Sequence, residues 1–319
     1  MAADLDALAL HLSGRSVRVR RRLRLVVAAS AALASAAAHA HVPTAGAAID
    51  WWPIEPWVVA LLALAAALYA VGIARIWRHA TTGRAVHARH ALAFAAAWLV
   101  TAAALLGPLD ALSAQLFSAH MLQHEALMVV AAPLFVLARP LGAWTWALPQ
   151  RWRRGLGGFF HRPAWRRPWL VVTAPLAAWL IHALALWLWH IPAWFEAALA
   201  NDGVHILQHA CFLIGALLYW WSVFGVGPRR NGGAAMASLF TTMIHTGALG
   251  ALLALSPVAW YPTYATRTLA FGLDPLEDQQ LGGLVMWIPA GFAYVACGLA
   301  TAARWLQRPD RVARAARAA

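Results

Sequence analysis

Seven apolar stretches, each close to the length that crosses a lipid bilayer, run through most of this chain. They cover residues 57–76, 90–107, 116–138, 169–190, 204–225, 235–256 and 281–303. A helix needs about 20 apolar residues to cross the hydrocarbon core, and only helices or closed barrels satisfy every backbone polar group there. The sequence therefore predicts an all-α integral membrane bundle of seven transmembrane helices.

The composition argues against a water-soluble globular fold. Of the 319 residues, 62% are hydrophobic and 12% are charged, and the mean hydropathy is +0.61. A formal net charge of +13 would indicate nucleic acid binding in a soluble protein. Here the arginines lie in short segments between the apolar stretches, which is typical of membrane topology. We therefore expect the lipid bilayer, and not nucleic acid, as a partner.

Charged residues divide between alternate loops. One set of loops is rich in arginine, and it contains Arg75 to Arg89, Arg139 to Arg167, Arg229 and Arg230, and Arg304 to Arg317. The other set contains Arg267 and the acidic residues Asp50, Glu55, Asp110, Glu196, Asp202, Asp274, Glu277 and Asp278. The positive-inside rule places the arginine-rich loops in the cytoplasm. This predicts an amino terminus outside and a carboxyl terminus in the cytoplasm.

The amino-terminal segment has the pattern of a secretory signal peptide. Arginines from Arg15 to Arg24 precede the apolar run 25–38, and Ala38 and Ala40 form a small-residue cleavage site. The apolar run is shorter than a spanning helix. We therefore expect a signal peptide over residues 1–40, a seven-helix transmembrane domain over 41–305 and a basic cytoplasmic tail over 306–319.

Histidines gather in one layer of the expected bundle. The third stretch begins with His120 and His124, which are four residues apart, on one helical face and about 6 Å apart along the axis. The fifth stretch repeats this spacing with His205 and His209, and His190 ends the oppositely directed fourth stretch. Such side chains are rare within spans and usually face the bundle interior or a water-filled cavity. Five imidazoles from three helices are thus expected near the outer face.

This spacing predicts a metal site. Two imidazoles four residues apart on a helix offer two nitrogens to one ion, in a pattern that suits copper, zinc or iron. His245 lies roughly 15 Å from the outer end of its span and is a further candidate ligand. Met121 would favour copper(I) through its thioether, and Glu125 is a candidate to hold an imidazole tautomer or to move a proton. We expect His182, two turns from His190, to have a structural role.

Two polar residues, Asp278 and Gln279, open the seventh stretch at the expected outer face. Their carboxylate and amide are candidates to orient an imidazole or to meet an incoming ion. For Asp278, a helix N-cap is the favoured role, because aspartate side chains accept hydrogen bonds from the first free N–H groups of a helix.

Four segments carry a resemblance to a known family: HMLQHEALMVVAAPLFVLARPL (120–141), WHIPAWFEAAL (189–199), VHILQHACFLIGALLYWW (204–221) and EDQQLGGLVMWIPAG (277–291). In this order they resemble the CtaG family of cytochrome c oxidase assembly factors. The resemblance implies a multi-pass protein of the bacterial inner membrane that is needed to make an active haem-copper oxidase. It also implies an oxidase subunit as partner and copper as the metal supplied. The six candidate histidines fall in or beside these segments.

Two other functions remain open from the residues alone. Histidines on neighbouring membrane helices also ligate haem b in electron carriers, and they relay protons or ions in transporters. The chain has no glycine-rich phosphate loop, no HExxH motif and no nucleophile elbow. The sequence therefore predicts a non-enzyme.

Overall fold

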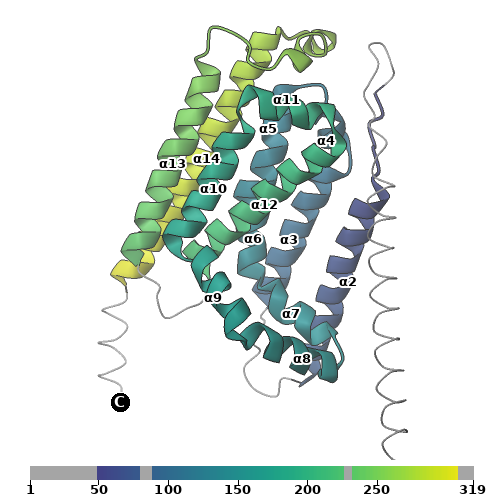
Figure 1. Cartoon of the computed structure of the whole chain (residues 1–319), viewed down its shortest axis with the longest axis vertical. Helices are drawn as coiled ribbons and strands as arrows, with labels where there is room; N and C mark the ends of the chain where they lie inside the picture. Colours follow the sequence, from purple (N-terminus) through teal and green to yellow (C-terminus); the bar gives the residue numbers. More distant parts are fainter. Residues whose placement is uncertain (1–48, 80–87, 226–231, 308–319) are drawn as a thin grey trace, which may run out of the picture.

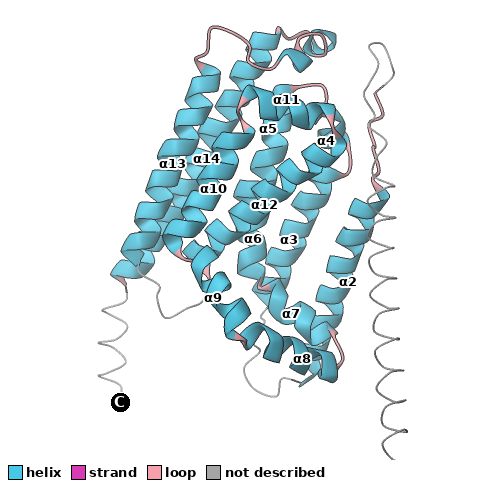
Figure 2. Ribbon diagram, in the orientation of Figure 1, coloured by secondary structure: helices cyan, strands magenta, loops and turns pink. Residues whose placement is uncertain are grey.

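The computed structural model describes residues 49–79, 88–225 and 232–307. The helices that make up the predicted spans are α2 (Pro56–His79), α3 (Ala88–Leu105), α5 (Phe117–Glu125), α6 (Ala132–Ala138), α9 (Pro163–Val172), α10 (Pro175–Trp189), α12 (Asp202–Phe224), α13 (Gly232–Ala254) and α14 (Pro275–Leu306). The helices between them are α4 (Pro108–Ser113), α7 (Pro140–Ala147), α8 (Gln150–His161) and α11 (Pro192–Ala200). Every regular element in these ranges is helical, as Figure 2 shows, which confirms the all-α prediction for the described residues.

Six of the predicted spans are long and apolar enough to cross a membrane as single units. They correspond to α2, α3, the continuous segment Phe117–Ala138, α12, α13 and α14. The fourth predicted span instead divides into α9 and α10, which are bent by 66° relative to one another. Pro175 begins α10, where its missing N–H and fixed φ favour a helix start over a helix interior. Pro175 thus lies at the bend of the fourth predicted span.

Different elements form the two ends of the bundle (Figure 1), and the charges of their residues differ. We call one the acidic end; it contains α4, α11 and the connection from α13 to α14, with Asp110, Glu196, Asp202 and Asp274. The other, the basic end, contains α7, α8 and α9, with Arg139, Arg153, Arg154, Arg166 and Arg167. The predicted orientation of the termini stays a prediction. The predicted signal peptide lies outside the described residues, as does the tail beyond Gln307.

A π-helical segment, Ala126–Ala131, joins α5 to α6 directly after the predicted metal-binding residues. The N–H of Ala132 bonds the carbonyl of Leu127 in the i to i−5 pattern of this helix. Pro133 has no N–H to give to the next carbonyl, that of Met128. The indole N–H of Trp220 on α12 donates to that carbonyl instead, at 2.9 Å. This bond compensates the irregular backbone and joins α12 to the third span.

Small residues let α13 and α14 approach closely. A Cβ atom on Gly283 would lie 2.6 Å from the carbonyl oxygen of Gly250 and 2.5 Å from the backbone nitrogen of Ala254. Transmembrane helices use such glycines because backbone contact adds dispersion energy where lipid offers no hydrophobic gain. This contact holds α14 in the position from which it reaches the start of α5.

We expect Gly283→Ala to lower the stability of the protein by about 1–3 kcal/mol, because the added methyl group must displace backbone atoms. Gly298→Ala, on the same helix, is the matched control, since a Cβ there meets nothing within 4 Å. Thermal unfolding in detergent measures both. Equal midpoints for the two variants would contradict the close approach of α13 and α14.

Candidate metal centre

The structure brings five of the six predicted histidine ligands together near the acidic end of the bundle. The ring centroids of His120 and His124 on α5 are 4.3 Å apart, as are those of His205 and His209 on α12. Between the two helices, the ring centroids of His120 and His205 are 5.4 Å apart, and those of His124 and His209 are 5.1 Å apart. His190, at the end of α10, lies 6.4 Å from His124. We call these residues the five-histidine cluster.

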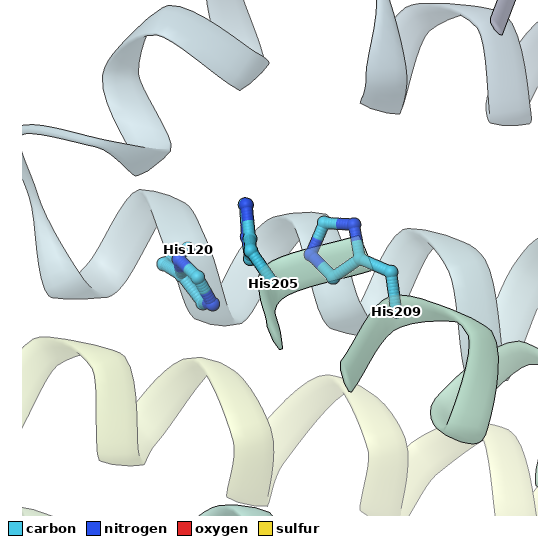
Figure 3. Close-up of side chains that lie close together, drawn as sticks. All are labelled: His120, His205 and His209. Carbon is cyan, nitrogen blue, oxygen red and sulfur yellow. The ribbon is translucent and has the colours of Figure 1, made fainter. Parts of the chain in front are cut away.

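Three members of the cluster have the geometry of a metal site. His120, His205 and His209 each offer a ring nitrogen, and these nitrogens lie within 4.8 Å of one another (Figure 3). In the described part of the chain, this is the one group of three or more histidine, cysteine or acidic residues that meets this distance. We call it the three-histidine site.

The ring nitrogens of the cluster are buried without hydrogen-bond partners. Both nitrogens of His120 and His124 are in this state, and so are the Nε2 atoms of His190, His205 and His209. More than nine in ten buried polar groups in proteins are paired, because an unpaired group forfeits its bonds to water. The orphaned nitrogens therefore fit a ligand that the protein itself does not supply, and metal ions are ligands that imidazole nitrogens bind.

His190 is fixed in one tautomer. Its Nδ1 lies 2.7 Å from the carbonyl oxygen of Leu186, and a carbonyl only accepts hydrogen bonds, so Nδ1 must carry the proton. Nε2 is then the atom with the free lone pair. A metal-binding imidazole commonly donates its other N–H to such an acceptor. His190 is therefore ready to bind through Nε2, although it lies at the edge of the cluster.

Asp278 positions the helix that carries His120 and His124. Its carboxylate accepts hydrogen bonds from the backbone N–H of Phe117 at 2.6 Å and of Ser118 at 3.2 Å, and from the Ser118 hydroxyl at 2.5 Å. It thus caps the amino terminus of α5. The predicted N-cap role at the start of its own helix belongs to Asp274, which forms a capping box with Glu277. The carboxylate of Asp278 is thus engaged at the start of α5, and its contact with an imidazole or an ion stays a prediction.

Gln279 also has a structural role. Its Oε1 accepts from the backbone N–H of Trp260 at 2.5 Å, and its Nε2 donates to the carbonyl of Val258 at 3.1 Å. These bonds hold the connection between α13 and α14. The side-chain amide of Gln279 is therefore engaged away from the cluster, contrary to the prediction that it orients a histidine.

Two accessory residues lie next to the histidines in sequence but face other surroundings. Met121 is fully buried and packs toward Gly282 on α14, where an added Cβ would lie 3.2 Å from Cγ of Met121. Glu125 is buried, and its Oε2 has no hydrogen-bond partner. The predicted hydrogen bond from an imidazole to this oxygen is thus not formed in the described structure.

His245 is not part of the cluster. Its ring lies 6.2 Å from that of His182 on α10 and 5.4 Å from that of Trp179. The sequence placed His245 deeper than the other candidates, but it could not show which helix α13 would face. The candidacy of His245 as a metal ligand stays a prediction, and the structure places it beside His182 instead of in the five-histidine cluster.

The sequence analysis missed Gln208, which is fully buried and lies beside His120. A glutamine between His205 and His209 in an apolar span was itself a signal, because an uncompensated amide in the membrane interior is costly. Gln208 adds an adjustable donor and acceptor to the wall of the three-histidine site.

A cavity of about 1150 Å³ leads to the three-histidine site. Its walls come from α2, α3, α12 and the segment around α4, and all three histidines line it. Its acidic end contains the carboxylates of Asp50, Glu55, Asp110 and Asp202. Carboxylates around an opening raise the local concentration of cations. The cavity therefore offers a cation a route to the site from the acidic end.

Asp110, on α4 between two spans, is perturbed by its position in this cavity. Its pKa is raised to about 6, mainly by burial, and the nearby Glu55 carboxylate adds to this increase. A 2.7 Å hydrogen bond from Gln123 acts in the opposite direction. The ordinary value is 3.8. The folded protein thus holds this proton more tightly than the unfolded chain, and its stability falls as the pH rises through this window.

We expect Asp110→Asn to remove this pH dependence, because the amide oxygen still accepts from Gln123 but carries no charge. The midpoint of thermal unfolding of the variant, relative to that of the parent protein, is expected to rise between about pH 4 and pH 7. Melting curves in detergent at several pH values measure it. A difference that stays constant over this range would contradict the raised pKa.

Known proteins with similar sequences match most of this chain. The chain is similar to uncharacterized proteins of Mycobacterium bovis and Mycobacterium tuberculosis, each 24% identical over 292 residues, which cover 85% of this chain and 42% of the relative. An uncharacterized protein of Mycobacterium leprae is 25% identical over 265 residues, or 77% of this chain and 38% of the relative. The chain thus spans less than half the length of these relatives. No solved structure matches the chain with significance.

A family model described as cytochrome c oxidase caa3 assembly factor matches residues 67–308. This range contains all four segments that carried the resemblance in the sequence, together with the five-histidine cluster and the helices that hold it. Since the match covers most of the chain, the chain belongs to the family of cytochrome c oxidase caa3 assembly factors.

Proposed function

We propose that this protein assists the assembly of a haem-copper cytochrome c oxidase in the bacterial inner membrane by binding copper at the three-histidine site and passing it to an oxidase subunit. The observation that supports this most directly is the set of three ring nitrogens within 4.8 Å of one another. Family membership supports the assembly role, since the family is described by it. Copper is the cargo in this proposal, not a permanent cofactor.

The chemistry of the site favours copper(I) as the bound form. Imidazole nitrogen suits zinc, iron and both oxidation states of copper. No carboxylate oxygen belongs to the group of ligand atoms in the described structure, so the charge of a bound ion stays uncompensated there. Because the cost of an unpaired charge in the membrane interior rises steeply with its size, a monovalent ion is favoured over a divalent one.

The residues around the site have separate tasks in this proposal. His120, His205 and His209 hold the ion, and the carboxylates at the acidic end of the cavity attract it. The ring centroid of His124 lies 5.1 Å from that of His209, and the ring centroid of His190 lies 6.4 Å from that of His124. Both residues offer free nitrogens next to the site. They provide positions to which the ion moves when one of the three ligands releases it.

Two measurements distinguish the copper proposal from the haem b carrier and from the transporter. A haem b carrier would show a Soret absorption band in the purified protein, and a transporter would show ion flux in proteoliposomes. In the copper proposal, the protein in detergent binds copper(I) under anaerobic conditions, shows no Soret band and loses one copper equivalent on replacement of all three site histidines by alanine.

His161→Ala is the matched control, because His161 is exposed on α8 at the basic end. Both variants are also tested for restoring oxidase assembly in a bacterium that lacks its own caa3 assembly factor. The triple variant is expected to fail and the control to succeed. A folded triple variant that binds copper like the parent protein would refute copper handling at this site. Loss of copper with full oxidase assembly would refute its role in assembly.

A further inference from the structure

A second group of buried polar atoms without partners lies on α10 and α13, away from the five-histidine cluster. Both ring nitrogens of His182 and of His245 belong to it, as does Nε1 of Trp179, and the ring of Tyr219 packs beside them. These side chains are neighbours. The ring of His182 lies 5.0 Å from Tyr219 and 6.2 Å from His245, and Trp179 lies 5.4 Å from His245.

The position of this group separates it from the first site. His182 is eight residues before His190, which places it about 12 Å further along α10, toward the middle of the bundle. It is only 2% exposed. Two histidines that each leave both nitrogens unpaired in the membrane interior are unusual, because such groups normally have protein or water partners. A ligand between them would remove the cost.

We propose that His182 and His245, here called the inner pair, form a second copper(I) site. Two imidazoles that bind one ion at metal–nitrogen distances of about 2.0 Å hold their ring centroids about 5 Å apart in a bent arrangement and about 6.3 Å apart in a linear one. The observed separation of 6.2 Å fits the linear arrangement. Copper(I) accepts two neutral nitrogen ligands, whereas zinc prefers four. The choice of copper as the ion rests on the function proposed above. The ring separation that suits one ion between the two histidines is independent of that function.

The surroundings of the inner pair fit a monovalent ion. The rings of Trp179 and Tyr219 pack against the two imidazoles. Among the described residues, no carboxylate interacts electrostatically with either histidine. A divalent ion there would have two uncompensated charges. With the three-histidine site, the inner pair gives the bundle two copper sites in series, from the acidic end toward the membrane centre.

The test counts copper(I) bound by the full chain in detergent, with a coloured copper(I) chelator as competitor. The parent protein is expected to bind two equivalents. The inner variant His182→Ala/His245→Ala and the outer variant His120→Ala/His205→Ala/His209→Ala are each expected to bind one. Trp179→Phe, which keeps both imidazoles, is the control and is expected to bind two.

A spectroscopic measurement identifies the ligands. X-ray absorption of the copper-loaded outer variant is expected to show two imidazole nitrogens around copper, whereas the inner variant is expected to show three. Should His182→Ala/His245→Ala fail to fold, His245→Gln alone replaces it, and it is expected to weaken binding at the inner pair at least tenfold.

Each pattern of results has one meaning. An inner variant that binds as much copper as the parent protein overturns the inner pair. A parent protein with one equivalent, lost only in the outer variant, also overturns the inner pair and leaves the proposed function intact. Loss confined to the inner variant upholds the inner pair and refutes the three-histidine site. Copper loss in neither variant refutes both.

Discussion

Single replacement of His120, His205 or His209 by alanine is expected to lower the affinity for copper(I) by about 100-fold or more, because each supplies one of three nitrogens to the ion. The same change at His124 or His190 is expected to lower it by about tenfold or less, which is the lower range for residues that support the ligands without forming the site. Competition with a copper(I) chelator measures all five variants under one set of conditions.

The comparison within the cluster is its own control, since all five histidines lie at similar depth and carry the same side chain. A variant counts only if it elutes as a single species in detergent and melts within a few degrees of the parent protein. Equal losses for all five would contradict the assignment of three ligands. A larger loss at His124 than at His209 would shift the site about one turn along the same face of α5, toward His124.

Replacing Asp278 by alanine is expected to destabilise the protein by about 3 kcal/mol or more, because it leaves two backbone N–H groups and a hydroxyl at the start of α5 buried without an acceptor. Copper(I) affinity is expected to fall as well, since α5 holds His120. Asp274→Ala, the matched control, removes an exposed cap and is expected to cost about 1 kcal/mol. Unfolding in detergent measures both variants.

Comparing the variants of Asp278 and Asp274 distinguishes three roles for Asp278. If Asp278 acted only within its own helix, the two variants would be equally destabilised and copper affinity would stay unchanged in both. If it contacted the ion, Asp278→Ala would weaken copper binding without changing stability. Only a cap on α5 predicts that stability and affinity fall together at Asp278 and not at Asp274.

Most of the helices were predictable because their information is local. An apolar stretch of spanning length has one way to satisfy its backbone in lipid, so α2, α3, α12, α13 and α14 follow from the sequence within a few residues. The bend between α9 and α10 did not follow. Proline is tolerated within many membrane helices, and whether Pro175 bends a span or begins a new helix depends on what its neighbours pack against.

The sequence predicted how deep the histidines lie in the bundle, but not which neighbouring helix each of them faces. Counting residues along a helix places a side chain at a known height, and the four-residue spacing of His120 with His124, and of His205 with His209, places each pair on one face. These two facts placed five histidines in a common layer. They did not show that His245 faces His182, because the rotation of α13 depends on its contact with α14 through Gly250 and Gly283.

The sequence by itself determined the helical fold, the spans, the layer of the histidines and the family. Tertiary structure alone decided which histidines meet, that Asp278 caps α5 across 160 residues of chain, and that His182 and His245 form a separate pair. The reason is physical: hydropathy and spacing act along one helix, whereas the rotation and neighbours of each helix result from packing among all of them.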